Sequence, residues 1–301
     1  MSTEQSVYFP VFNPDLKNEE LLITEEEYHA RKDLVHQSTL KHMIKSENAF
    51  YRSLIYPKPH TKSLRLGTLA HKAILEGKEF LLEYVVQPVF KGLTKDGVET
   101  TSMNAKSVQA ARDEWYAQLK PGTKVVEQKE LDEIRWMLDS LVNHKFVQEM
   151  FKNGRPEVRG CFKDEKTNIG VAFADDFLSF DLDVWADLKT CQDSSHDGFR
   201  KSVEKFRYDL QYYTYSLGNE LVFGKKPKMP VWIAVESSEP FETKIHFVDD
   251  FYYDTGKYEF RKSMDKLEAA LKSGKWPQAQ EVIETVEPSP WFRGYYDLRL
   301  N

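Results

Sequence analysis

The amino-acid sequence predicts an α/β fold in which a central mixed β-sheet is flanked by helices. Its 301 residues suit one large domain, or one domain with an insertion. Three β-like runs lie close together at residues 156–163, 168–178 and 183–189, and Ser179-Phe180-Asp181 between the last two is typical of a hairpin turn. Helical patterns precede and follow this block, so helices are available to cover both faces of a sheet.

The two ends of the chain are expected to lie outside the domain proper. Residues 1–25 contain Pro10 and Pro14 among acidic runs, which favours an extended arm. Residues 26–275 are predicted to form the domain, and residues 276–301 form an aromatic tail. Either end could pack between subunits, cover a sheet edge or contact a partner, and neither has a pattern that assigns it a role.

The spacing of apolar residues predicts the remaining elements. Ser38 or Thr39 can cap a helix that runs to about Leu54 and is broken by Pro57-Lys58-Pro59. A second helix over residues 65–76 has an apolar stripe, with His71 on the edge of that stripe. The other expected elements are a β-like run at 84–87, a mobile loop at 91–104, helices at about 105–119, 128–145 and 196–218, strands at 230–236 and 243–248, and a basic helix at about 253–272.

Composition narrows the class of protein. Only Cys161 and Cys191 are present, so a disulfide framework is not expected. The sequence has no signal-peptide pattern and no apolar run of about 18 residues, which predicts a cytoplasmic protein with no membrane partner. The net charge of −6 does not exclude nucleic acid, because phosphate binding needs only a local basic strip. Candidates for such a strip are Lys62, Arg65, Lys72, Arg200, Lys201, Lys205 and Arg207.

Two acidic stretches near the predicted hairpin carry the clearest chemical signal. Asp176 and Asp187 are separated by ten residues, and Lys189 follows the second aspartate in the pattern D-x-K. Two carboxylates on neighbouring strand ends can hold a hard divalent cation such as Mg²⁺, which prefers oxygen ligands. Lys189 alternates with Asp187 and shares its face of the strand, where it can orient water or stabilise charge on a phosphate. Alternatively, these are two hairpin aspartates and a solvated lysine.

Further polar residues could join this site. His71 can reach into a site while its helix packs, although it could equally be a partly buried structural histidine. Glu157 alternates with Val158 in a β-like stretch, which gives one more carboxylate. Downstream, one helix face carries a polar, aromatic stripe that suits contact with a nucleic-acid backbone or with a catalytic strand, made of Tyr208, Gln211, Tyr212 and Tyr215.

The order of these motifs resembles the RecB-like branch of the PD-(D/E)xK nuclease superfamily, and more closely the exonuclease VIII (RecE-type) nuclease domain with its phage relatives. The resemblance covers roughly residues 25–275. Its four stretches are Tyr28 to Leu40, Leu66-Gly67-Thr68-Leu69-Ala70-His71, the two aspartate strands with Asp187-Leu188-Lys189-Thr190, and Tyr208 to Tyr215. One departure stands out, since Ala174 and Asp175 replace the family's arginine and proline. This departure leaves the register open: Asp176 fits the D-F-L pattern best as the first metal aspartate, and Asp175 is the fallback.

The resemblance implies a restriction-endonuclease-like sheet and a role for each candidate residue. Asp176, Asp187, the Leu188 carbonyl and His71 would bind Mg²⁺, with Mn²⁺ as a possible substitute. Lys189 would position the attacking water, and Glu157 would bind a second metal or order a water. Gln211 and Tyr215 would brace the site or touch the DNA strand.

The resemblance also implies an activity. The expected enzyme digests linear double-stranded DNA from 5′ to 3′ and leaves a 3′ single strand for a recombinase or single-strand annealing protein, as a ring-like homo-oligomer in recombination or repair. Three alternatives remain open: a single-strand or structure-specific nuclease, a nuclease-like module that only binds DNA or protein, and a sugar- or nucleotide-handling enzyme with an unrelated D-x-K. The last would not explain the histidine helix together with the glutamine–tyrosine helix.

Overall fold

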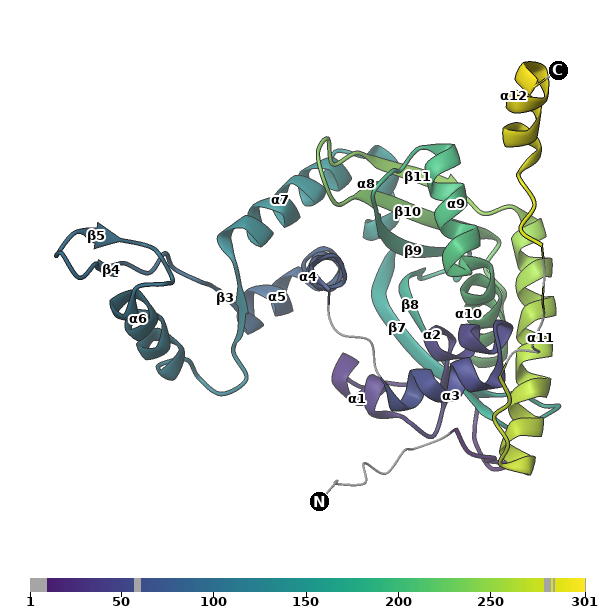
Figure 1. Ribbon diagram of the computed structural model, residues 1–301. Helices are drawn as coiled ribbons and strands as arrows, with labels where there is room; N and C mark the ends of the chain where they lie inside the picture. Colours follow the sequence, from purple (N-terminus) through teal and green to yellow (C-terminus); the bar gives the residue numbers. More distant parts are fainter. Residues whose placement is uncertain (1–9, 57–60, 279–282, 284, 301) are drawn as a thin grey trace.

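The computed structural model describes residues 10–56, 61–278, 283 and 285–300, and its centre is a mixed sheet of seven strands (Figure 1). Along the main path the order is β1 (Glu19–Glu20), β7 (Gly154–Lys163), β8 (Gly170–Ser179), β9 (Val184–Cys191), β10 (Met229–Glu236) and β11 (Thr243–Phe247). The seventh strand, β2 (Val35–His36), pairs with β8. The β9–β10 and β2–β8 pairs are parallel and the others are antiparallel, so the predicted mixed α/β fold is confirmed.

Helices cover both faces of this sheet because its strands alternate apolar side chains between two cores. In β10, Val231, Ile233 and Val235 enter one core, whereas Trp232 and Ala234 enter another. The first core is closed by α4 (Lys62–Leu75), α5 (Gly77–Glu83), α7 (Gln128–Val142) and α8 (Lys145–Lys152). The opposite face is covered by α9 (His196–Phe206), α10 (Tyr208–Phe223) and α11 (Asp250–Ser273), with α2 (Gln37–Leu40), the 3₁₀-helix η1 (Lys41–Ile44) and α3 (Glu47–Ile55) beside them (Figure 1).

Strand β8 has one edge that is shared between two partners. On its first edge, β7 pairs with it over residues 170–179. On the other edge, β9 pairs with Phe177 and Leu178, and β2 pairs with Val171 and Ala172. Strands β8 and β9 therefore separate beyond Phe177, and a fork opens between them.

The alternation of side chains in β8 breaks at this fork. Asp175 contacts Asn219 of α10, whereas Phe177 packs into the core beneath α4 and α7. Residues two apart in a regular strand share a face, so the strand is distorted at Asp176. The register of the neighbouring pairs places Glu157 of β7 opposite Asp176. Glu157 has a φ of 54°, a left-handed conformation that is uncommon for a residue other than glycine.

The predicted strands and the histidine helix match observed elements closely, but three predicted elements are wrong in detail. The expected helix from Ser38 or Thr39 to Leu54 is divided into α2, η1 and α3, and Ser46 caps α3 through a bond from the Ala49 amide. The expected helix at 196–218 is divided at Arg207, whose φ of 60° ends α9 before α10 begins. The prediction that Pro57-Lys58-Pro59 breaks a helix concerns residues outside those described.

The third correction concerns the expected loop at 91–104, which contains a small hairpin. Strands β4 (Gly92–Leu93) and β5 (Glu99–Thr100) pair with each other, and β3 (Tyr84–Val86) pairs with β6 (Lys124–Val126). The hairpin and α6 (Lys106–Ala117) protrude from the body of the molecule (Figure 1). This lobe interrupts the chain between the histidine helix and α7 without altering the central sheet.

The two ends of the chain differ in how they meet the domain. Before α1 (Glu25–Ala30), strand β1 pairs with β7, so the arm joins the sheet edge. After α11, Trp276 packs against Phe50 and Tyr51 of α3, with ring centroids 5.9 and 5.4 Å apart. Helix α12 (Pro290–Leu300) lies beyond this contact, away from the sheet (Figure 1). None of the helices in the described ranges is long and apolar enough to span a membrane.

Candidate functional site

The two predicted metal aspartates face each other across the fork. The register of β8 and β9 sets Asp176 opposite Asp187, one step beyond the last paired residues. The Leu188 amide donates to Asp176 Oδ2 at 2.7 Å, and Gln211 Nε2 of α10 donates to Asp187 Oδ1 at 2.7 Å. Asp187 is fully buried, whereas the Asp176 side chain keeps 16% exposure. The fork thus holds two carboxylates at the boundary between core and solvent.

Lys189 lies beside these carboxylates, as its alternation with Asp187 predicted. Its ammonium group forms an ion pair with Asp187 Oδ2. The same nitrogen lies 4.8 Å from the centroid of the Tyr208 ring, so a cation–π contact holds the lysine from the other side. The Lys189 side chain is 14% exposed, and its charge therefore acts in a poorly solvated environment.

The histidine helix reaches the fork because Gly67 allows α4 to approach β9 closely. A Cβ atom at Gly67 would lie 3.0 Å from Thr190 Oγ1, tighter than ordinary van der Waals contact. His71 lies about one turn further along the same helix. Its Nδ1 is 3.7 Å from Asp176 Oδ2, and its ring hydrogen-bonds the backbone of Leu188. The glycine of one motif and the threonine of another are thus the contact that brings His71 to the aspartates.

Glu157 also reaches the site, accompanied by an arginine that the sequence analysis did not single out. Arg159 Nη2 donates to Glu157 Oε2 at 2.6 Å, and Arg159 is 8% exposed. The same guanidinium lies 4.0 Å from Glu76 Oε1. The spacing between Glu157 and Arg159 could have indicated this arginine, because residues two apart in a strand share a face.

The glutamine–tyrosine helix contributes side chains to two different environments. Gln211 and Tyr215 face the fork, and Tyr208 contacts Lys189. Tyr212 is instead buried in the core, with its ring centroid 5.6 Å from that of Trp185. The stripe therefore contacts β9, the strand that carries Asp187 and Lys189, in line with one of the two interpretations that its pattern allowed.

These side chains line one cleft of about 620 Å³, which we call the site cleft. Asp187 lies directly beneath it, in contact with Lys189 and Gln211. The predicted site residues that line the site cleft are His71, Glu157, Asp176, Lys189, Gln211 and Tyr215. Asp175 is excluded from it, because its carboxylate is buried against Trp185 Nε1 at 2.8 Å and Asn219 Nδ2 at 3.0 Å. Asp176, not Asp175, therefore faces the site cleft.

Burial makes the carboxylates of the fork unusually hard to ionise. Desolvation raises the pKa of Asp187 to about 6, and it raises the pKa of Glu157 to about 8 with help from the neighbouring charge of Asp176. The pKa of Asp176 is also raised by burial, although Lys189 opposes the shift. Burial, then Lys189, lowers the pKa of His71 to about 4, so its imidazole is neutral and able to bind a metal well below pH 6.5.

The donor set of the fork fits a hard divalent cation. Asp176 and Asp187 supply carboxylate oxygens, and Leu188 and His71 add a main-chain carbonyl and a neutral imidazole. Across the described ranges, no three His, Cys, Asp or Glu side chains already converge as a metal site. The carboxylates are engaged by Lys189, Gln211 and the Leu188 amide instead. Binding would therefore exchange some of these partners for the ion.

Most of the expected basic strip is engaged in ion pairs within the chain. Arg65 pairs with Glu130 at 2.5 Å, and Lys72 pairs with Glu76 at 3.0 Å. Arg200 and Arg207 are also paired, with Asp197 and Asp209 respectively. The lysines of the strip that remain as candidates for phosphate contact are Lys62, Lys201 and Lys205.

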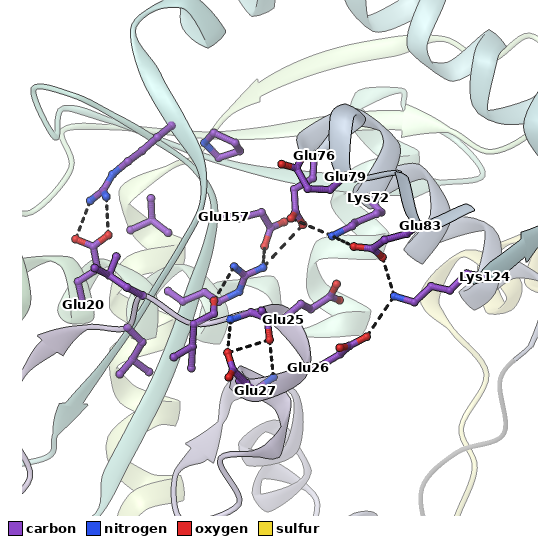
Figure 2. Close-up of a pocket in the computed structure, with 18 residues that line it drawn as sticks. Glu20, Glu25, Glu26, Glu27, Lys72, Glu76, Glu79, Glu83, Lys124 and Glu157 are labelled. Carbon is purple, nitrogen blue, oxygen red and sulfur yellow. Dashed lines mark hydrogen bonds and ion pairs between the residues drawn. The ribbon is translucent and has the colours of Figure 1, made fainter. Parts of the chain in front are cut away.

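A second cavity of about 510 Å³ adjoins the site cleft, and we call it the acidic pocket (Figure 2). Its carboxylates alternate with cations: Lys124 bridges Glu83 and Glu26, and Lys72 bridges Glu83 and Glu76. Other glutamates around it are Glu20, Glu25, Glu27, Glu79 and Glu157. Glu157 lines both cavities, so the two share a wall.

The chain is similar in sequence to a known family and in fold to a solved structure. Residues 37–288 match the family described as "PDDEXK-like domain of unknown function (DUF3799)". The chain belongs to this family. A crystal structure from Eubacterium rectale, of a protein named "Putative exonuclease", is similar to this PDDEXK-like chain with a TM-score of 0.58 and 13% identity, covering 92% of this chain and 98% of the other. At that identity the likeness shows the fold. No curated protein matches the sequence.

The recognition from sequence motifs is thus confirmed at the level of the PDDEXK-like fold. Family membership and the exonuclease-like neighbour support a nuclease, and nucleases of this fold generally use divalent metal ions.

Proposed function

We propose that this PDDEXK-like chain is a Mg²⁺-dependent exodeoxyribonuclease that degrades linear double-stranded DNA. The observation that carries the proposal is the fork between β8 and β9. There Asp176 lies opposite Asp187 and accepts a bond from the Leu188 amide, and Asp187 forms an ion pair with Lys189. Two carboxylates and a lysine in a partly closed cleft are the groups that phosphodiester hydrolysis requires.

The metal would be held by Asp176 and Asp187, with His71 and the Leu188 carbonyl as further ligands. Mn²⁺ offers a similar preference for oxygen and imidazole donors and should substitute. When bound, the ion lowers the pKa of water and offsets the charge that develops at phosphorus.

The surrounding side chains have separate tasks in this proposal. Lys189 orients the attacking water and stabilises negative charge on the phosphate. Glu157, held by Arg159, orders a second water or a second ion. Gln211 fixes the Asp187 carboxylate through its 2.7 Å bond, so the carboxylate enters the reaction already oriented. Tyr215 lines the site cleft from the same helix as Gln211 and would brace that wall.

The size of the site cleft bears on the substrate. A volume of about 620 Å³ lies in the range of pockets that hold one small molecule, so it suits a single nucleotide strand better than an intact duplex. A duplex end would therefore be opened before cleavage. Digestion from 5′ to 3′, delivery of the 3′ strand to an annealing protein or recombinase, and a ring-like oligomer around the duplex follow from the resemblance to the exonuclease VIII nuclease domain.

Purified protein incubated with end-labelled linear duplex DNA tests this proposal. We expect mononucleotide release with Mg²⁺ and none with a chelator, and covalently closed circles should survive. Asp187→Ala should be inactive, whereas Asp113→Ala, which changes an exposed carboxylate of α6, should behave as wild type. Cleavage of closed circles at a comparable rate would replace the exonuclease with an endonuclease. No cleavage of any DNA would leave a nuclease-like binding module.

A second candidate is a nuclease specific for single strands or branched structures. The same small site cleft favours it, because a strand that is already unpaired can enter without opening a duplex. Parallel digestion of single-stranded, flapped and blunt duplex substrates separates the two. A blunt duplex digested as fast as the single strand supports the exonuclease, and digestion of the single strand alone supports the second candidate.

A further inference from the structure

An exposed aromatic ring stands at the rim of the site cleft, where α9 meets α10. Phe206, the last residue of α9, is 44% exposed and lines the cleft together with Tyr208. Single exposed aromatic residues are ordinary on protein surfaces. Phe206 differs because its ring stacks on Tyr208, which contacts the catalytic lysine, Lys189.

The rings of Phe206 and Tyr208 form a row that leads inward from the rim. Their centroids are 5.9 Å apart, with 28° between the ring planes. Lys189 Nζ lies 4.8 Å from the Tyr208 centroid, and Lys205 Nζ lies 5.2 Å from the Phe206 centroid. Phe206 is thus no more than a few nucleotide steps of about 3.4 Å from the lysine that would meet the scissile phosphate.

The backbone between the two rings adopts a costly conformation. Arg207 has φ 60° and ψ 52°, the left-handed region, which is unfavourable for a residue other than glycine. Its guanidinium makes two bonds to Asp209, at 2.9 and 2.7 Å, and lies 3.5 Å from Glu259. Gln37 donates to its carbonyl at 3.4 Å. These contacts hold the chain in a turn that stacks Phe206 on Tyr208.

We infer that Phe206 is a DNA-binding residue that stacks on a nucleobase of the strand entering the site cleft. Stacking on an aromatic ring tolerates any base, as an exonuclease without sequence preference requires. Lys205 beside the ring would contact the adjacent phosphate. The stack would hold an opened strand in register with Lys189. This inference rests on the proposed nuclease function.

Abasic substrates test this inference directly. A series of duplexes is prepared, each with a single abasic site at a different one of the first several positions from the cleaved end. Each duplex is digested with Mg²⁺, and its KM and kcat are measured. With wild type, the abasic site at one position should raise KM roughly 5- to 150-fold, the range expected for one lost base stack. Phe206→Ala should raise KM similarly on intact DNA, with kcat changed less, and the abasic site should then add less than about twofold.

Control variants separate stacking from a merely structural effect. Phe206→Trp should restore the low KM and its dependence on the base. Phe180→Ala removes a ring that is 70% exposed in the turn after β8, and it should behave as wild type. If the abasic site raises KM equally in wild type and Phe206→Ala, or at no position, the stacking role is wrong.

A binding measurement distinguishes failure of this inference from failure of the proposed function. The fluorescent base 2-aminopurine is placed in a duplex end at the position where an abasic site raises KM. Quenching of its fluorescence by the protein is followed with Ca²⁺ in place of Mg²⁺. Quenching by wild type and not by Phe206→Ala, without cleavage in Mg²⁺, would keep the stacking platform and remove the nuclease. Cleavage in Mg²⁺ with equal quenching by both proteins would keep the nuclease and remove the platform. Absence of binding would remove both.

Discussion

The site cleft and the acidic pocket share Glu157 as a wall, and both are rich in carboxylates, yet the pKa values of Glu83 in the pocket and Asp187 beneath the cleft shift in opposite directions. In the acidic pocket, ion pairs with Lys124 and Lys72 lower the pKa of Glu83 against the effect of its burial. In the site cleft, burial outweighs Lys189 and raises the pKa of Asp187 to about 6. Glu83, held between two lysines, joins elements of the fold. A carboxylate that burial makes hard to ionise, as at Asp187, is typical of a functional site.

The largest difference between the two cavities should appear on removing a carboxylate. Asp187→Ala or Asp176→Ala should lower cleavage of linear duplex DNA on the order of 10³-fold or more, as for other groups that act as a unit. Glu83→Ala should leave kcat within about threefold, because that carboxylate only pairs with lysines. Steady-state cleavage assays on the three variants check this. Equal losses in the Glu83 and Asp187 variants would remove the distinction between the cavities.

Lysines should differ in the same way as carboxylates. Lys189→Ala should lower kcat about 10²- to 10³-fold with little change in DNA affinity, because its charge acts mainly on the transition state. Lys124→Ala should leave kcat near wild type, since Lys124 bridges Glu83 and Glu26 in the acidic pocket. Single-turnover rates and filter binding measure the two quantities separately. Weakened binding with unchanged turnover in Lys189→Ala would make that lysine a simple phosphate contact.

The contact of α4 with β9 at Gly67 should determine where His71 lies in the site cleft. Gly67→Val should lower cleavage about 10²-fold, because the added side chain would meet Thr190 and move His71 away from Asp176. Gly77→Val is the matched control, since a Cβ there would have no atom within 4 Å. Circular dichroism and cleavage rates are compared for both. A fully active Gly67→Val protein would show that His71 does not depend on this contact.

The smallest expected effect is the pH dependence of stability without metal. Glu157 has a pKa of about 8 in the fold, so between pH 6.5 and 8 the folded protein binds more protons than the unfolded chain. Stability therefore falls as pH rises through this window, by at most about 1.4 kcal/mol per pH unit for one group, or a few degrees in Tm. His71, with a pKa of about 4 in the fold, opposes this slope near pH 6.5, where the imidazole of the unfolded chain is half protonated, and contributes little above about pH 7.5.

Thermal unfolding in a chelator at several pH values measures this slope. Glu157→Gln should flatten it, whereas Glu83→Gln should leave it unchanged, because the lowered pKa of Glu83 adds stability that is lost only as pH falls. A wild-type Tm that rises from pH 6.5 to 8 would mean that Glu157 is not held in a raised-pKa environment.

Sequence reasoning reached the strands and the candidate site residues because both depend on local patterns. The alternation of β7 to β10 and the spacing of Asp176, Asp187 and Lys189 are visible along the chain. What it missed depends on tertiary contact. Arg207 ends α9 in a left-handed conformation, and the bonds of its guanidinium to Asp209 stabilise that conformation.

The choice between Asp175 and Asp176 shows the same limit. The sequence has two adjacent carboxylates, and only the fit to the family pattern favours Asp176 over Asp175. The distortion of β8 opposite Glu157 decides it, and that distortion arises from pairing with β7 and from the hydrogen bonds of Asp175 to Trp185 and Asn219.

Direct titration of the metal-free protein with Mg²⁺ or Mn²⁺ by isothermal calorimetry tests whether the buried carboxylates of the fork hold a divalent cation. We predict saturable binding in wild type and in Glu83→Gln, with proton release at pH 7, and loss of that binding in Asp187→Asn. Metal binding that survives in Asp187→Asn but disappears in Glu83→Gln would place the cation in the acidic pocket and contradict the account.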